Sequence, residues 1–254
     1  MTTEQKVLII GDIHAEFEAA EKAYSSIKDE IEKSVDLLIQ VGDFGFWPHS
    51  IADPWEKELN HKAVFVDGNH ENHEVLHGEE EFQDFLERKG SLIDNPDIWK
   101  YSRWENCMDI WEHKSRGEIE NGILYIGGAA SVNKKHRTPG EDWFPSEDIR
   151  YKEKLRTMGN IDEYGADHIH TVISHECPSE FNVSERMDKD ILKNDSNRIF
   201  LQEVLQEVEP NEWYFGHYHK KMKGECNETK WRCIDMIRPE EDDCDYVFTS
   251  FPNR

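Results

Sequence analysis

Carboxylate, amide and imidazole side chains recur in this sequence directly after short apolar runs. Eight residues occupy such positions: Asp12, His14, Asp43, Asn69, His70, His175, His217 and His219. A set of nitrogen and oxygen donors without thiolates suits divalent ions such as Mn²⁺, Fe²⁺ or Zn²⁺, rather than Ca²⁺ or a structural zinc–thiolate site. The pattern therefore indicates a metal centre.

The spacing of these residues predicts more than one ion. Asp12 and His14 are separated by one residue, as are His217 and His219. In an extended segment this spacing puts both side chains of a pair on the same face. Two such pairs with further ligands exceed the needs of one ion, so we expect two ions that share the Asp43 carboxylate.

The stretch HTVISHECPSE, residues 170–180, is ambiguous when it is taken alone. It is compatible with a metal ligand, with a Cys/His nucleophile pair, or with the end of a buried strand. Alternation along an extended segment puts Ile173 and His175 on one face and Ser174 and Glu176 on the other.

Apolar runs that end in Gly, Asp, Asn or His predict buried strands with polar residues at their carboxyl ends. These runs are 7–10, 36–41, 63–67, 123–128, 170–173 and 213–215, and two further strands are expected within 230–237 and 246–251. Amphipathic periodicity predicts helices over 16–33, 80–90 and 197–208. Asn121-Gly122 favours a type I′ hairpin turn. The order indicates a layered α/β fold with a ligand site at one sheet edge.

Composition narrows the class of protein. The chain has 254 residues, 54 acidic and 30 basic, for a net charge of -24. We expect one domain over 1–254, and no stable binding to nucleic acid because a polyanion would be repelled. Five cysteines without a C-x-x-C pair indicate reduced thiols. The N-terminal apolar run is too short for a signal peptide or a membrane span, so we expect a cytoplasmic protein.

Five motifs, in order, resemble the calcineurin-like metallophosphoesterase superfamily. They are Gly11-Asp12-Ile13-His14, Gly42-Asp43, Gly68-Asn69-His70-Glu71, His175 and Gly216-His217-Tyr218-His219. The segments VDGNHEN, GGAASV and EDWFP are similar to the small bacterial and phage branch. The resemblance implies a four-layer fold, in which two mixed β-sheets pack face to face with flanking helices.

The resemblance also implies a role for each motif residue. Asp12, His14, Asp43 and His219 would hold one divalent ion, and Asp43, Asn69, His175 and His217 the other, with Mn²⁺ expected and Fe²⁺ or Zn²⁺ as alternatives. A hydroxide bridging the ions would attack phosphorus, and His70 would protonate or stabilise the leaving oxygen. Glu176 and Cys177 would be bystanders.

The sequence departs from protein Ser/Thr phosphatases of this superfamily after Asp43. Phe46 stands where those relatives have the Asp that orients the catalytic His, and Trp47 stands where they have a phosphate-binding Arg. A protein phosphatase is therefore disfavoured. His70 is left without its usual carboxylate partner, unless Asp67 or another acid takes that place.

Substrate contacts must come from elsewhere in the chain. Arg137, with Lys134 or Lys135, is a candidate phosphate ligand on the loop after 123–128, although an exposed basic loop is the alternative. His73 is a further candidate. Aromatic residues could stack a leaving group or simply pack in the core; they are Phe46, Trp47, Trp143 and Phe144.

We expect the substrates to be phosphomonoesters or small nucleotides. A phosphodiesterase or nuclease of the same fold and a non-catalytic binding scaffold are the alternatives. A nuclease would carry a basic groove, and a scaffold would have lost ligands; the sequence shows neither. The oligomeric state does not follow from the sequence.

Overall fold

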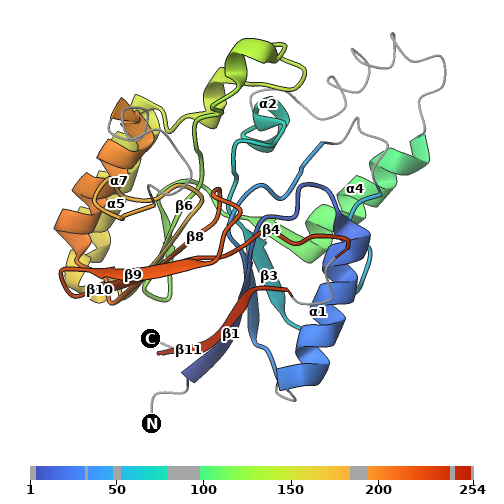
Figure 1. Cartoon of the computed structure of the whole chain (residues 1–254), viewed down its shortest axis with the longest axis horizontal. Coiled ribbons are helices and arrows are strands. Elements are labelled where there is room, and N and C mark those ends of the chain that lie inside the picture. Colours follow the sequence, from blue (N-terminus) through green and yellow to red (C-terminus); the bar gives the residue numbers. More distant parts are fainter. Residues whose placement is uncertain are drawn as a thin grey trace.

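The computed structural model describes residues 4–31, 34–47, 53–78, 98–183, 194–240 and 244–252. Two mixed β-sheets form its centre (Figure 1). The first has the order β11-β1-β2-β3-β4 and contains β1 Glu4–Ile10, β2 Leu37–Gln40, β3 Lys62–Phe65, β4 Trp111–His113 and β11 Tyr246–Pro252. The second has the order β5-β6-β7-β8-β10-β9 and contains β5 Glu118–Glu120, β6 Ile123–Ile126, β7 Thr171–Ser174, β8 Glu212–Phe215, β9 Met222–Cys226 and β10 Thr229–Cys233.

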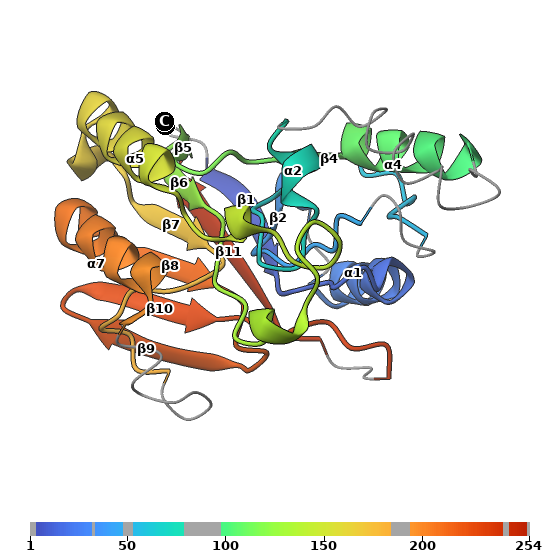
Figure 2. The ribbon, with the colours of Figure 1, turned by 90° about the horizontal axis from the view of Figure 1, so that it is seen from above.

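Helices cover the outer faces of both sheets. The α-helices are α1 Phe17–Ile31, α2 His73–Leu76, α4 Ile98–Ile110, α5 Tyr151–Tyr164 and α7 Ser196–Val208. Short 3-10 helices are η1 Lys134–His136, η2 Pro145–Glu147 and η3 Ala166–His168. Helices α5 and α7 lie beside the second sheet, and α1 and α4 lie on the opposite side of the molecule (Figure 2).

Alternation along the strands explains the layers. Val7 and Ile9 of β1 belong to a core shared with Ile123 and Ile173 of the second sheet. Leu8 and its neighbours on the other face of β1 pack in a separate core with residues of α1. Because side chains point alternately to the two faces, each strand serves an inner and an outer core. The expected four-layer fold of two facing sheets with flanking helices is confirmed.

Most of the predicted elements are present. The helices expected over 16–33 and 197–208 form as α1 and α7, and β1 and β2 pair in parallel on either side of α1. Asn121 and Gly122 have φ values of 52° and 76° between the antiparallel strands β5 and β6, as a type I′ turn requires. The helix expected over 80–90 lies outside the described residues.

The strand expected within 230–237 is shorter than predicted. It ends at Cys233 as β10, opposite Phe215 at the end of β8. The chain then crosses to the first sheet, where Ile237 N donates to Asp12 O over 2.9 Å. The apolar run continues past the strand because Ile234 and Ile237 are buried in the cores. No helix among the described residues combines the length and apolarity needed to cross a membrane.

Candidate metal centre

Four side chains converge just beyond the ends of β1, β2 and β8. The Nε2 atoms of His14 and His219 are 2.8 Å apart, and His219 Nε2 lies 3.3 Å from Asp12 Oδ2. His14 Nε2 also lies 3.6 Å from Asp43 Oδ2. One potential ligand atom of each residue lies within 4.8 Å of the others. The four are therefore close enough to share a cation.

A second group of ligands shares Asp43 with the first. His175 Nε2 lies 3.3 Å from Asp43 Oδ1 and 3.4 Å from Asn69 Oδ1. Potential ligand atoms of Asp43, His175 and His217 also lie within 4.8 Å of one another. The Asp43 carboxylate thus directs Oδ2 to one group and Oδ1 to the other. The structure brings all seven predicted ligands together, and their metal binding stays a prediction.

Unusual backbone geometry aims these side chains. His14, Asp43, His217 and His219 have φ values of 52°, 52°, 69° and 47°. Few residues other than glycine adopt this left-handed region, and such conformations gather at functional sites. Each of the four lies just beyond a strand, so the turn made there directs its side chain into the centre.

Two glycines allow the chain to pass close to the carboxylates. A Cβ atom on Gly68 would lie 2.0 Å from Asp43 Oδ1, and one on Gly216 would lie 2.0 Å from Asp12 Oδ1. Contacts of that length are sterically forbidden, so only glycine fits either position. The glycines of these two motifs are therefore explained by the close approach of the backbone to a predicted ligand.

Glu71 supports the loop that follows Asp43. Its Oε1 accepts from Phe44 N over 2.7 Å, and its Oε2 accepts from Gly45 N over 3.1 Å and from Phe46 N. Burial raises the pKa of Glu71 to about 8, while the backbone donors oppose that rise. The acid that ends the Gly68–Glu71 motif therefore fixes the backbone next to the shared ligand.

The charges of Asp43 and His175 depend on each other. Burial opposes ionisation of Asp43, but His175, His70 and His14 hold its pKa well below the usual range. Burial also lowers the pKa of His175, yet the Asp43 carboxylate overrides it and raises the value to about 10. Because only a neutral imidazole is a metal ligand, metal binding must release this proton.

Neighbouring groups orient two of the ligands. His175 Nδ1 lies 2.9 Å from Val41 O, so it donates there and leaves Nε2 for the metal. Asn69 Nδ2 donates to Ser131 Oγ over 3.1 Å, and Ser131 Oγ donates to Glu147 Oε2 over 2.7 Å. This chain of hydrogen bonds directs Asn69 Oδ1 toward the centre. The sequence analysis did not assign these roles to Ser131 and Glu147.

Glu176, expected to be a bystander, lies beside the predicted metal ligand His217. It is 1% exposed, and its Oε2 lies 3.6 Å from His217 Nε2. Its Oε1 accepts from the Tyr218 hydroxyl and from Cys177 N. A carboxylate behind a metal-binding imidazole fixes the ring and increases its basicity. Its position next to His175 is visible in the sequence, but its partner His217 is defined only by the fold.

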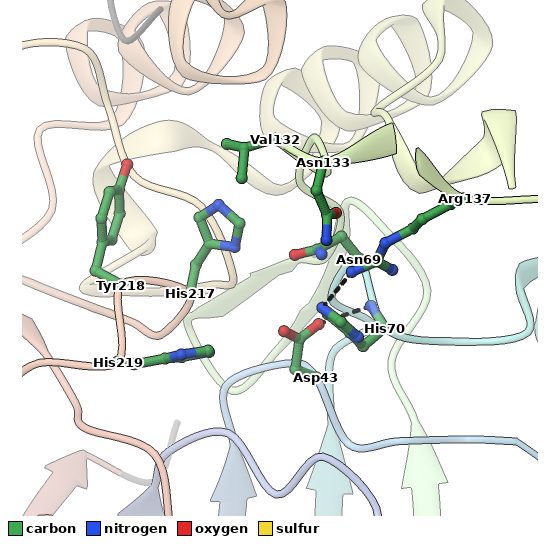
Figure 3. Close-up of a pocket in the computed structure, with 9 residues that line it drawn as sticks. All are labelled: Asp43, Asn69, His70, Val132, Asn133, Arg137, His217, Tyr218 and His219. Carbon is green, nitrogen blue, oxygen red and sulfur yellow. Dashed lines mark hydrogen bonds between the residues drawn. The ribbon is translucent and has the colours of Figure 1, made fainter. Parts of the chain in front are cut away.

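His70 and Arg137 lie together on the wall of a pocket of about 260 Å³ that opens onto the centre (Figure 3). Arg137 Nη2 lies 3.1 Å from His70 Nε2. Since a guanidinium only donates, Nε2 is the acceptor and the imidazole is neutral. Burial lowers the pKa of His70 to about 4, with Asp43 opposing the shift. Asn133 and Tyr218 also line the pocket.

Two predicted substrate contacts lie away from this pocket. His73 is fully buried, and its Nδ1 lies 3.4 Å from Asp67 Oδ2. It therefore cannot contact a substrate from its present position, because helix α2 turns the side chain back into the protein. Lys134 is exposed in η1 and does not line the pocket, although Arg137 on the same loop does.

The structure also shows where the candidate carboxylate partner of His70 and the candidate aromatic residues lie. Asp67 is not the carboxylate partner of His70, because it forms an ion pair with Arg116 and faces His73. Phe46 packs on Trp104 and Phe144 is buried, and neither lines the pocket. Phe46 and Phe144 thus pack in the core, the alternative stated for them, and Trp47 and Trp143 are half-buried.

Cys177 does not have the surroundings of a nucleophile. Its side chain is fully buried, and its Sγ lies 3.8 Å from the Tyr218 hydroxyl. Burial and the neighbouring Glu176 raise the pKa of the thiol well above its ordinary value. Since the thiolate is the reactive form, the interpretation of 170–180 as a Cys/His nucleophile pair is disfavoured.

The donor set fits a pair of divalent cations. Two carboxylates, an amide oxygen and imidazoles face a common volume, and Asp12 and Asp43 are almost fully buried. Two nearby buried acids are costly to ionise unless cations neutralise them. Nitrogen and oxygen ligands without thiolates suit Mn²⁺, Fe²⁺ or Zn²⁺.

Comparisons with known proteins concern the family and the fold of the chain. The family model of calcineurin-like phosphoesterases matches residues 5–248. The crystal structure of TT1561 from Thermus thermophilus is similar, with a TM-score of 0.52, 10% identity, and coverage of 99% of this chain and 100% of that one. A dimetal phosphatase from Danio rerio has a TM-score of 0.49 and 10% identity, with coverage of 96% and 91%. No curated protein matches the chain.

Proposed function

Because the chain belongs to the calcineurin-like phosphoesterase family and is therefore a hydrolase of phosphoric esters, we propose that it cleaves phosphomonoesters or small nucleotides at a centre of two divalent cations. Mn²⁺ is the expected ion, with Fe²⁺ or Zn²⁺ as alternatives. One observation carries this proposal: the Asp43 carboxylate belongs to both groups of ligand atoms. A shared carboxylate is what two adjacent ions require.

Seven residues would hold the two ions, and the ions would activate water. Asp12, His14, Asp43 and His219 would hold one ion, and Asp43, Asn69, His175 and His217 the other. When bound, the ions would lower the pKa of water from about 15.7 toward about 7 and neutralise charge on phosphoryl oxygens. Glu71, Ser131 and Glu176 would keep the ligands in place through the contacts described above.

His70 and Arg137 would act on the substrate itself. Arg137 is half-buried on the pocket wall, where its guanidinium can bind two phosphoryl oxygens. A phosphate that accepts from Arg137 would compete with its bond to His70 Nε2, 3.1 Å long. The freed nitrogen could then carry the proton needed by the leaving oxygen.

The size and charge of the protein favour a small substrate. The pocket of about 260 Å³ lies just below the range of about 300–1,000 Å³ found for ligand sites. Arg137 is the permanently cationic side chain among the described residues that line it. A net charge of -24 disfavours a long polyanion.

The test is hydrolysis by chelator-treated protein supplemented with Mn²⁺, Fe²⁺ or Zn²⁺. Aryl phosphates, nucleoside monophosphates, aryl phosphodiesters, cyclic nucleotides and single-stranded DNA are compared at equal concentration. We expect metal-dependent release of phosphate from the monoesters and almost none from Asp43→Asn. Undiminished activity in Asp43→Asn would contradict the shared ligand, and a preference for diesters or DNA would favour the alternative function.

A further inference from the structure

A second cluster of metal-ligating side chains lies behind the pocket. We call Asp67, His73, His77 and His113 the Asp67 cluster. Asp67 follows β3, His73 begins α2, His77 caps the end of α2, and His113 ends β4. None of the four lines the pocket of the metal centre. Figure 1 shows α2 above the ends of β3 and β4.

The imidazoles surround the Asp67 carboxylate at one common distance. His77 Nε2 lies 3.3 Å from Oδ2, and His113 Nε2 lies 3.4 Å from Oδ1. Ligand atoms of these three residues all lie within 4.8 Å of one another. His73 Nδ1 lies 3.4 Å from Oδ2 on another side.

These separations fit a bound cation, although the pair of His113 and Asp67 also has the geometry of a long hydrogen bond. Ligands about 2.0–2.2 Å from a tetrahedral zinc ion lie about 3.3–3.6 Å from one another. Two pairs of ligand atoms in the metal centre have this spacing, 3.3 Å from His175 to Asp43 and 3.3 Å from His219 to Asp12, while other pairs there range from 2.8 to 3.9 Å. Hydrogen bonds between nitrogen and oxygen are commonly about 2.7–3.2 Å long.

Several nitrogens in the cluster lack hydrogen-bond partners. His77 Nε2 and both ring nitrogens of His73 are buried and unpaired among the described residues. The His73 side chain is 0% exposed and that of His77 is 10% exposed. Buried polar atoms are rarely left without a partner in folded proteins, so a missing ligand is indicated.

Arg116 contacts the same carboxylate, and its positive charge bears on whether a cation can bind there. Its Nη2 contacts Asp67 Oδ2, and its Nη1 donates to Glu153 Oε2 over 2.9 Å. The guanidinium of Arg116 balances the charge of Asp67, since Glu153 is also bound by Arg150 over 2.7 Å. It also fixes the Asp67 carboxylate in the orientation that faces the imidazoles, as an outer partner of a metal ligand does.

We propose that Asp67, His77 and His113 bind one further divalent cation of the zinc type, separate from the two-ion centre. Two imidazoles and a carboxylate suit Zn²⁺, and His73 lies beside the site. A pocket of about 350 Å³ gives access, and His77 and His113 line it together with Glu153 and four cationic residues, Arg116, Arg150, Lys152 and Arg156. The ion would connect α2 and β4 to Asp67, which follows β3. Asp67 lies two residues before the predicted ligand Asn69.

The test measures zinc binding rather than catalysis. Chelator-treated protein in the Asp43→Asn background, where the two-ion centre is impaired, is titrated with Zn²⁺ by calorimetry. We expect one tight equivalent, and its loss or a weakening of at least about 100-fold on adding His113→Gln, because one of three ligands is removed. Co²⁺ in place of Zn²⁺ should give a strong four-coordinate absorption band that the added substitution abolishes.

The controls separate this site from the proposed function. His77→Gln, on a different element, should have the same effect, and it decides the outcome if His113→Gln fails to fold by circular dichroism. His168→Gln, on exposed η3, should leave the zinc equivalent unchanged. Zinc binding that is equally tight with and without His77 and His113 would overturn the proposal. Hydrolysis by the otherwise unchanged chain is measured separately, so its presence or absence does not decide this result.

Discussion

Substituting Gly68 by alanine should damage the metal centre without touching any ligand's chemistry. The new Cβ would lie 2.0 Å from Asp43 Oδ1 and 2.2 Å from Asp43 N, whereas real Cβ contacts stay beyond 3.0 Å. Asp43 and its backbone must therefore move away by about 1 Å, and a displacement of that size costs about 100-fold in rate. The overlap should also reduce the free energy of unfolding by about 1–3 kcal/mol.

The assay compares Gly68→Ala with Gly159→Ala. Gly159 lies in α5, and a Cβ added there would meet nothing within 4 Å, so alanine should keep activity and stabilise the helix by about 0.5–1 kcal/mol. Metal affinity by calorimetry, hydrolysis of p-nitrophenyl phosphate and thermal unfolding are measured for both. If Gly68→Ala retained wild-type metal affinity and rate, the steric account of the glycine would be refuted.

Three further predictions follow from the site. His70→Ala should lower kcat by about 10²–10⁴-fold with metal content kept; loss of metal would show instead that His70 holds the ligands. Glu176→Gln should weaken metal binding by about 10–100-fold in calorimetry. Glu207→Gln, exposed on α7, should leave the affinity unchanged. Equal affinities of the two variants would show that Glu176 does not support a metal ligand. Because burial raises the pKa of Cys177, its neutral thiol should resist alkylation by iodoacetamide at pH 8, as mass spectrometry would show, and Cys177→Ser should remain active; rapid alkylation of Cys177 in the folded protein would contradict this.

The elements that position the site were largely predictable because their signals are local. An apolar run bounded by Gly or Asp predicts a buried strand wherever it occurs, and β1, β2 and β3 follow that rule. The Asn121-Gly122 turn was predictable because its positive φ values favour those two residues. Helix α5, whose 14 residues include Gly159, and the short strands β4 and β9 were not predicted. Strands β4 (WEH) and β9 (MKGEC) contain no continuous apolar run, so the signal that predicts β2 and β3 is absent from them.

The positions of the candidate substrate contacts relative to the pocket were not predictable, because they depend on side-chain direction. Arg137 and Lys134 lie three residues apart on one loop, yet Arg137 lines the pocket and Lys134 is exposed. His73 lies three residues after His70 but faces Asp67, since α2 begins there and reverses the side chain. Neither outcome follows from spacing within a loop, where no regular period relates position to direction.

The sequence by itself predicted the donor types of the centre, since these are fixed by residue identity, as are the glycines that precede Asp12, Asp43, Asn69 and His217. It also determined the strand ends on which the ligands lie, because apolar runs and their polar ends are local features. Only the tertiary structure decided which distant residues meet: Glu176 with His217, Ser131 with Asn69, and Asp67 with Arg116. These pairs depend on how two sheets are stacked and how loops cross between them, and such contacts carry no signature in the chain on either side.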